Sequence, residues 1–199
     1  MKKTLATLIL GLMLTIGGSI VCAGPLEDGL AAAQRGDYAT ALRLWRPLAD
    51  RGNASAQHNL GVMYSNGRGV PQDYIEAVKW YRKAAEQGFA DAQFNLGNIY
   101  LNGRGVPQDY AEAVKWYRLA ADQGNADAQI NLGLMYANGQ GVPQNFVRAH
   151  MWVNLSVTKG NKNAAKYRDL AAGRMTPEQL AQAQEMTRKC QLSNYKQCD

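Results

Sequence analysis

The chain has 199 residues, of which 46% are apolar and 19% are charged, and its formal net charge is +6. An apolar share of this size excludes wholesale disorder, and the length fits one or two domains. Three cysteines and two histidines are too few for a small disulfide-built protein or for a zinc site with several protein ligands.

Residues 1–23 have the three parts of a secretory signal peptide. Lys2 and Lys3 precede an apolar stretch at 5–16, and Val21-Cys22-Ala23 has the small-residue pattern of a cleavage site. We predict cleavage after Ala23 and a periplasmic or secreted protein. A retained membrane helix is one alternative, although the apolar stretch is shorter than the roughly 20 residues that a span needs. Lipoprotein processing at Cys22 is another, but Val21 stands where glycine or alanine is expected.

Cleavage changes the charge and the cysteine count of the mature chain. Two of the 22 basic residues leave and all 16 acidic residues stay, so the net charge becomes 20 − 16 = +4. Cys190 and Cys198 remain, eight positions apart. In an oxidising compartment we expect them to form a structural disulfide, with two unpaired thiols as the alternative.

The mature chain repeats with a period of 36 residues. Residues 56–91 and 92–127 are identical at 28 of 36 positions, and residues 128–163 share 17 with the preceding copy. Residues 37–55 align with the second half of the unit, so residues 24–55 are predicted to form a first, shorter repeat. Residues 164–199 are predicted to form capping helices and a tail. A period of this length is typical of stacked repeat proteins.

Each copy is predicted to begin with a helix that has one apolar stripe. In residues 56–91 the stripe consists of Ala56, Leu60 and Tyr64, and the same residue types recur one and two periods later. Asn66 and Gly67 are predicted to end this helix, because both residue types adopt the left-handed backbone conformation readily.

A second helix is predicted to follow a short loop in each copy. Asp73 and Glu76 have the spacing of a capping box at its start, as do Asp109 and Glu112 in the next copy. Its predicted buried residues are Ala77, Trp80, Tyr81 and Ala84, and its predicted exposed residues are Lys79, Arg82 and Lys83. One helix pair cannot bury its stripe alone, so the pairs must stack into an all-α solenoid.

The shared residues resemble the Sel1-like repeat, a relative of the tetratricopeptide repeat. The run A-x-x-x-L-G-x-x-Y-x-x-G-x-G-V-x-x-(D/N)-(Y/F)-x-x-A-x-x-W stands at 56–80, 92–116 and 128–152. The resemblance implies a right-handed α-solenoid of stacked antiparallel helix pairs without a cofactor. Thr176 and Pro177 are predicted to start a further helix, which resembles the closing helix of bacterial Sel1-like arrays.

Differences between the copies predict a binding surface. Three of the eight positions that differ between the two closest copies are 58/94, 62/98 and 65/101, which lie on one face of the first helix. First helices line the concave face of a tetratricopeptide-like superhelix, so this stripe predicts a partner-binding groove, with packing between repeats or neutral drift as the alternative. The predicted groove residues are His58, Val62, Ser65, Phe94, Asn98, Leu101, Ile130, Leu134 and Ala137.

Two sets of asparagines recur in every copy, one near the loop and one seven positions earlier. They are Asn66, Asn102, Asn138, Asn59, Asn95 and Asn131. Either set could reach a peptide backbone, but identical residues suit identical surroundings, so capping and hydrogen bonding between repeats is the preferred interpretation.

Patterns for other chemistry are weak. Ser156 with Lys159, and Ser193 with Lys196, have the Ser-x-x-Lys spacing of penicillin-recognising enzymes, but no Lys-Thr-Gly or Ser-Asp-Asn motif accompanies them. His58 and His150 lack a second ligand at helical spacing, so no metal site is predicted. Lys79, Arg82, Lys115 and Arg118 form a basic stripe without stacking aromatic residues, which favours a solvated outer face over a nucleic-acid site.

Together these patterns predict an exported, non-enzymatic scaffold or adaptor that binds a protein or peptide in its groove. A periplasmic serine enzyme or β-lactam-binding protein is one alternative, and a module that binds cell-wall polymers is another. We expect neither nucleic-acid binding nor a membrane span after cleavage.

Overall fold

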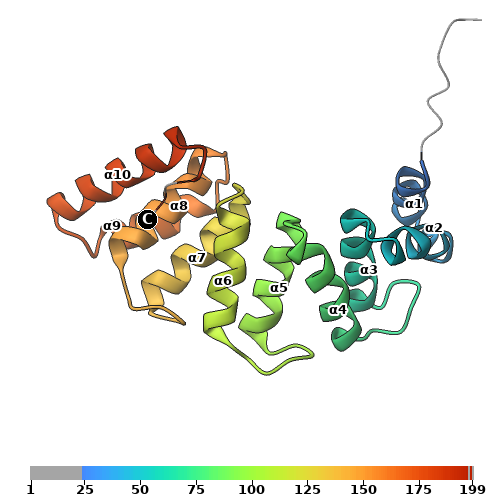
Figure 1. Ribbon diagram of the computed structural model, residues 1–199. Helices are drawn as coiled ribbons and strands as arrows, with labels where there is room; N and C mark the ends of the chain where they lie inside the picture. The colour runs from blue at the N-terminus through green and yellow to red at the C-terminus, as the bar shows by residue number, and fades with distance from the viewer. Residues whose placement is uncertain (1–23, 197, 199) are drawn as a thin grey trace, which may run out of the picture.

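The described part of the chain, residues 24–196 and 198 of a computed structural model, forms ten α-helices and no strand (Figure 1). The helices are α1 (Pro25–Gln34), α2 (Tyr38–Asp50), α3 (Ala54–Asn66), α4 (Tyr74–Glu86), α5 (Ala90–Asn102), α6 (Tyr110–Ala121), α7 (Ala126–Asn138), α8 (Phe146–Thr158), α9 (Ala164–Ala172) and α10 (Pro177–Leu192). The predicted signal peptide, residues 1–23, lies outside the described residues.

The helices stack as pairs along one direction. From α1 to α9 each helix packs against the next one in the chain, whereas α10 packs on α8. Figure 1 shows the array running from α1 and α2 at one end to α8, α9 and α10 at the other. The buried side chains form a row of apolar clusters between neighbouring helices, in which Leu60, Leu96 and Leu132 are fully buried. This arrangement confirms the predicted all-α solenoid.

Side chains cap the starts of all helices except α1, α5 and α9, but the predicted capping box at α4 is incomplete. Asp73 Oδ1 accepts hydrogen bonds from the N–H groups of Ile75 and Glu76, at 2.9 and 3.0 Å. The Glu76 side chain does not complete a capping box, because it pairs with Lys79 at 2.8 Å instead. The aspartate half of the predicted capping box is therefore present and the glutamate half is absent, and the same holds at α6.

At α6 the acidic side chain has two other partners. Asp109 caps the helix, while Glu112 accepts hydrogen bonds from Lys115 Nζ and from the indole N–H of Trp116, both at 3.1 Å. A complete capping box occurs at α10, where Thr176 and Gln179 bond reciprocally. The predicted start of α10 is therefore confirmed.

A glycine in the middle of α5 lets an aromatic ring lie directly on the helix backbone. A Cβ atom at Gly97 would stand 2.5 Å from the ring of Tyr117, and one at Gly61 would be equally close to Tyr81. Both rings are buried. This close contact sets the distance between the two helices in the pairs α3–α4 and α5–α6, whereas Val153 takes the place of the ring at Gly133 in the pair α7–α8.

Buried glutamines connect successive repeats. Gln57 Nε2 donates to the carbonyl of Ala49 at 3.0 Å, and Gln57 Oε1 accepts from Gln87 at 2.7 Å. Gln93 and Gln123 repeat this second contact at 2.7 Å. The next pair differs, because Lys159 takes the place of Gln87 and Gln123. As a result the Gln129 side-chain oxygen is buried without a hydrogen-bond partner among the described residues.

The last two helices both pack on α8, and a disulfide fixes the end of α10. Cys190 is bonded to Cys198, with their Cα atoms 4.4 Å apart, as the sequence led us to expect. Between them Asn194 and Tyr195 adopt positive φ angles of 52° and 65°, and the Lys159 ammonium lies 4.6 Å from the centre of the Tyr195 ring. The covalent bridge thus keeps the tail against the last repeats.

Candidate functional site

The first helices α3, α5 and α7, with the loops that follow them, form one face of the solenoid, which we call the first-helix face. The chain turns back after each first helix in the same way: Gln72, Gln108 and Gln144 donate to the carbonyls of Ser65, Leu101 and Ala137 at 2.7–2.8 Å. Identical loops therefore present different side chains at equivalent positions, which is what a selective surface requires.

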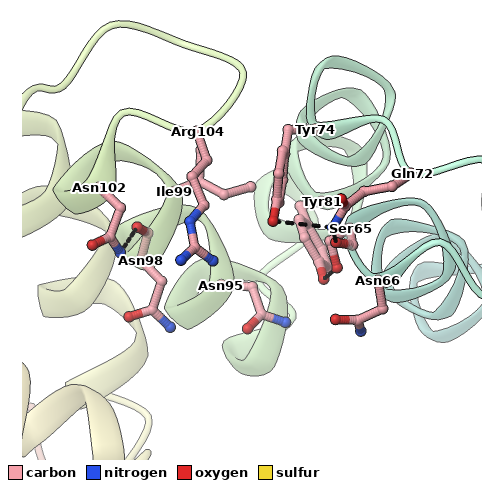
Figure 2. A pocket seen from close by; sticks show the side chains of 10 residues that line it. All are labelled: Ser65, Asn66, Gln72, Tyr74, Tyr81, Asn95, Asn98, Ile99, Asn102 and Arg104. Carbon is pink, nitrogen blue, oxygen red and sulfur yellow. Dashed lines mark hydrogen bonds between the residues drawn. The ribbon is translucent and has the colours of Figure 1, made fainter.

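A cleft of about 280 Å³ lies on this face between α3 and α5. Figure 2 shows its lining side chains, which are mostly amides and hydroxyls. They are Ser65, Asn66, Gln72, Tyr74, Tyr81, Asn95, Asn98, Ile99, Asn102 and Arg104. We call this site the Arg104 cleft, because Arg104 is its one charged lining residue.

Tyrosine and amide groups hold the floor of the Arg104 cleft in place. Tyr81 and Ser65 hydroxyls lie 3.1 Å apart, and burial raises the pKa of Tyr81 to about 12, so it stays a neutral hydroxyl. Asn98 Oδ1 accepts from Tyr117 Oη at 2.7 Å and from Asn131 Nδ2 at 3.3 Å. The amide oxygen of Asn98 is thereby occupied, and its NH2 group is the part that can donate to a ligand.

His58 borders this floor. Its ring lies between Phe89 and Tyr81, with ring centroids 5.1 and 5.8 Å away, and its Nε2 is 3.1 Å from Asn95 Nδ2. Burial lowers the pKa of His58, an effect that the nearby Asp91 carboxylate partly opposes. The imidazole is therefore neutral at pH 7 and serves as a hydrogen-bond acceptor for Asn95.

Arg104 reaches the cleft from the loop after α5. Its guanidinium lies 5.6 Å from the centre of the Tyr74 ring, and Figure 2 shows it extending toward the side lined by Asn95 and Asn98. Arg68, one period earlier, lies over Tyr38 in the same way, at 5.7 Å. Each arginine is thus oriented by the first aromatic residue of an earlier second helix.

The profile of the Sel1 repeat family matches this chain four times, at residues 24–53, 54–89, 90–125 and 126–161. The chain belongs to the Sel1 repeat family. Its matched units start two residues before the copies predicted here, at the first residue of α3, α5 and α7. No curated protein matches the chain.

Two solved Sel1 repeat structures are similar over most of this chain. A Sel1 repeat protein from Oxalobacter formigenes is 30% identical with a TM-score of 0.66, and the match covers 83% of this chain and 75% of that one. The protective antigen c5321 of uropathogenic Escherichia coli is 32% identical with a TM-score of 0.57. That match covers 82% of this chain but only 43% of the antigen.

The structure places the nine predicted groove residues of this Sel1 repeat protein in several different environments. Ser65 and Asn98 line the Arg104 cleft, and Val62 lines a smaller one of about 70 Å³ under Arg68. Leu134 and Ala137 line a third cleft of about 450 Å³, which also involves Tyr167, Leu170 and Arg174. Five of the nine residues therefore border clefts, although not a single one.

The other four predicted residues pack inside or between repeats. Phe94 lies on the Tyr117 ring, with centroids 6.0 Å apart, and Leu101 is half-buried against the same apolar cluster. Ile130 is only 9% exposed and packs with Val153 and Ala164, so its prediction as an exposed groove residue was wrong. The cause is α9, which covers this position in the last Sel1 repeat.

Sequence reasoning missed most of the Arg104 cleft. Asn66, Asn95 and Asn102 were attributed to capping, and the hydrogen bonds of Asn66 to the Val62 carbonyl and of Asn102 to the Asn98 carbonyl confirm that role. These amides nevertheless line the cleft as well. Arg104 was overlooked because only comparison with Gln140, its equivalent in the last copy, sets it apart.

The Ser-x-x-Lys pairs lack the geometry of a nucleophile and its base. Ser156 is fully buried, and the Lys159 ammonium donates to the Gly124 carbonyl at 2.6 Å. Ser193 Oγ donates to the Cys190 carbonyl at 2.8 Å.

The expectation of a solvated basic stripe also needs correction, since Arg82 and Arg118 donate to the hydroxyls of Tyr100 and Tyr136 across the repeat boundaries.

Within residues 24–196 and 198, no group of three or more His, Cys, Asp or Glu side chains is arranged to hold a metal ion. No helix there combines the length and apolar character that crossing a membrane needs. The clefts of the first-helix face are the candidate functional site of this Sel1 repeat protein.

Proposed function

We propose that this Sel1 repeat protein is a non-enzymatic scaffold or adaptor that binds a protein or peptide partner through its first-helix face. The observation that carries the proposal is the set of three clefts on this face, which lie where α3, α5 and α9 each pack on the repeat before them. They are lined by residues that differ between copies whose helices and loops are otherwise the same. Sel1 repeats mediate protein interactions generally, which supports the same conclusion.

The chemistry of the clefts suits an extended peptide. The Arg104 cleft offers amides and hydroxyls, which pair with the N–H and C=O groups of a peptide backbone. The third cleft adds the apolar side chains of Leu134, Phe146 and Tyr167, which can bury an apolar side chain of the partner. Polar and apolar subsites on one face would together give a partner both register and affinity.

The proposed location is the cell envelope or the outside of the cell. Residues 1–23 have the pattern of a secretory signal peptide, and the Cys190–Cys198 disulfide is of a kind that persists in oxidising compartments. Cell fractionation followed by mass measurement of the mature chain tests this. We expect a chain that begins at Gly24, in the periplasmic or secreted fraction, and full-length chain in the cytoplasm would contradict the proposal.

The binding face can be tested with two charge-matched double variants. Asn66→Glu with Asn102→Glu places two carboxylates at the exposed rim of the Arg104 cleft. Ile75→Glu with Ala111→Glu adds the same charge at exposed positions in the first turns of α4 and α6. The protein and both variants are crosslinked to their partners in intact cells and purified.

We expect the rim variant to lose the crosslinked partners and the outer variant to keep them. Circular dichroism must show the same helix content for all three proteins. Equal recovery of partners by both variants would contradict binding through the first-helix face. Loss from the outer variant alone would move the binding surface to the second helices.

A further inference from the structure

We propose that the Arg104 cleft binds a carboxylate of the partner peptide, which makes it the subsite that selects acidic sequences. This proposal rests on the proposed function and makes it specific. Arg104 is the only charged residue among the ten that line the cleft, and none of the ten is acidic. A cleft with one cation and no compensating anion favours a negatively charged ligand group.

The hydrogen-bond donors of the cleft point to the same ligand. Asn98 keeps its NH2 group available, because its oxygen is occupied by Tyr117 and Asn131. The Tyr74 hydroxyl accepts from Gln72 Nε2 at 3.1 Å, which leaves its own O–H to donate. With the guanidinium of Arg104, these groups supply donors of three kinds to one site, which suits the two acceptor oxygens of a carboxylate.

Acceptor groups stand at the rim of the cleft. Asn66 and Asn102 use their NH2 groups to bond to the carbonyls of Val62 and Asn98, at 3.0 and 2.7 Å. Their amide oxygens are therefore the atoms left to accept hydrogen bonds from a ligand. Donors in the centre and acceptors at the rim match a carboxylate that is flanked by the N–H groups of its own peptide backbone.

The neighbouring repeats lack this combination of groups. In the cleft under Arg68, Val62 stands at the position of Asn98 and Trp45 at the position of Tyr81, and the volume is only about 70 Å³. One period after Arg104, Gln140 removes the loop charge and Leu134 replaces the amide of Asn98. The third cleft has an arginine of its own, Arg174, but Leu134 lines it where Asn98 lines the Arg104 cleft. Among the described residues, a loop arginine and an amide at the position of Asn98 occur together only between α3 and α5, so the carboxylate is expected at one position of the bound peptide.

The carboxylate can come from an aspartate or glutamate side chain or from the C-terminus of the partner. The test therefore uses two libraries of random dodecapeptides on phage, one with internal peptides and one with free C-termini. Selections are run with the mature protein, with Arg104→Gln and with Arg188→Gln. Arg188→Gln is the matched control, because it makes the same change of charge at an exposed position of α10 that lines none of the three clefts.

If the carboxylate comes from a side chain, the internal peptides selected by the unaltered protein are expected to share Asp or Glu at one position. If it comes from the C-terminus, only the library with free C-termini is expected to yield binders. Dissociation constants of selected peptides are then measured by fluorescence anisotropy. Replacing the acidic residue by its amide, or amidating the C-terminus, is expected to weaken binding at least about tenfold. Arg104→Gln is expected to do the same, with no further loss when both changes are combined, whereas Arg188→Gln retains the affinity.

Two results would overturn the proposal, and they differ in what they say of the proposed function. Peptides without an acidic preference that bind equally well to Arg104→Gln, yet fail to bind the Asn66→Glu and Asn102→Glu double variant, would refute the carboxylate site while supporting the first-helix face. If the unaltered protein selects no peptide from either library, both proposals fail.

Discussion

At the scale of single residues, the exceptions to the repeat show which contacts stabilise it. Gln57 and Gln93 each donate a hydrogen bond to a backbone carbonyl of the preceding repeat and accept one from a glutamine of the same repeat. Gln129 makes the first contact, at 3.2 Å from Ala121, but its oxygen is buried and unpartnered among the described residues. A buried acceptor without a partner lowers stability, so the third link is the weakest.

Isosteric replacements can measure this difference. Gln93→Met and Gln129→Met both remove a donor to a backbone carbonyl, but only Gln93→Met also removes an occupied acceptor. We expect Gln129→Met to be less destabilising than Gln93→Met by about 1 kcal/mol in the free energy of unfolding, measured by urea titration. Equal losses would show that the Gln93–Gln123 contact contributes nothing measurable.

The two histidines make stability depend on pH. Burial lowers the pKa of His58 and of His150 from the ordinary value of 6.5, and for His150 the charge of Arg168 adds to the effect while Asp169 opposes it. Below pH 6.5 the unfolded chain then binds more protons than the folded chain, so the free energy of unfolding falls as the pH falls.

We expect this loss between about pH 7 and about pH 5, and we expect His58→Gln to make it smaller. Urea titrations at both pH values, with the unaltered protein and the variant, measure the effect. A loss that is the same in His58→Gln would assign it to other groups.

At the scale of helices, an aromatic ring lies directly on a glycine in the pairs α3–α4 and α5–α6. A Cβ at position 97 would stand 2.5 Å from two ring atoms of Tyr117, which is fully buried and bonded to Asn98. The ring has no free space to move into. The glycine is therefore required by packing rather than by backbone conformation.

Gly97→Ala should accordingly destabilise the protein by about 1–3 kcal/mol, although alanine is the better helix former. Thermal and urea unfolding measure the change. In a double-mutant cycle, Tyr117→Ala should cancel part of the cost of Gly97→Ala, because it removes the ring that clashes. Strict additivity of the two changes would place the strain elsewhere.

At the scale of the whole molecule, the solenoid is a row of local contacts. Helices α1 to α9 pack mainly on their neighbours in the chain, so a complete period can be removed without breaking distant contacts. We expect a variant without residues 92–127 to stay helical and cooperative, with a lower free energy of unfolding, as judged by circular dichroism during urea titration. If the variant lost a larger share of its helix content than the share of the chain that was deleted, distant repeats would have to stabilise one another.

The same deletion also tests the site. It joins residues 56–91 to the last copy, so Leu134 and Gln140 replace Asn98 and Arg104 in the remaining cleft. The shortened protein should therefore lose its preference for acidic peptides while remaining folded. A retained preference would show that Arg104 does not determine it.

The sequence by itself determined the repeat, its period, the helix pairs and the end of each first helix. These features depend on local chemistry, namely the four-residue stripe, the Asn-Gly stop and the Asp73 and Asp109 caps, and each is copied from repeat to repeat. It also determined which positions vary on the first helix, because aligning the repeat copies requires only the sequence.

Only the tertiary structure decided what those variable positions do. Ile130 is covered by α9, Phe94 packs on Tyr117, and Glu76 prefers Lys79 to its capping role, because each choice depends on a side chain whose place the sequence pattern does not give. The Arg104 cleft combines α3, α4, α5 and two loops, so its donors come together only when two repeats stack. Side chains of adjacent repeats meet across 18 positions of chain, as in Arg82–Tyr100, and up to 37, as in His58–Asn95. Local periodicity carries no information about such pairs.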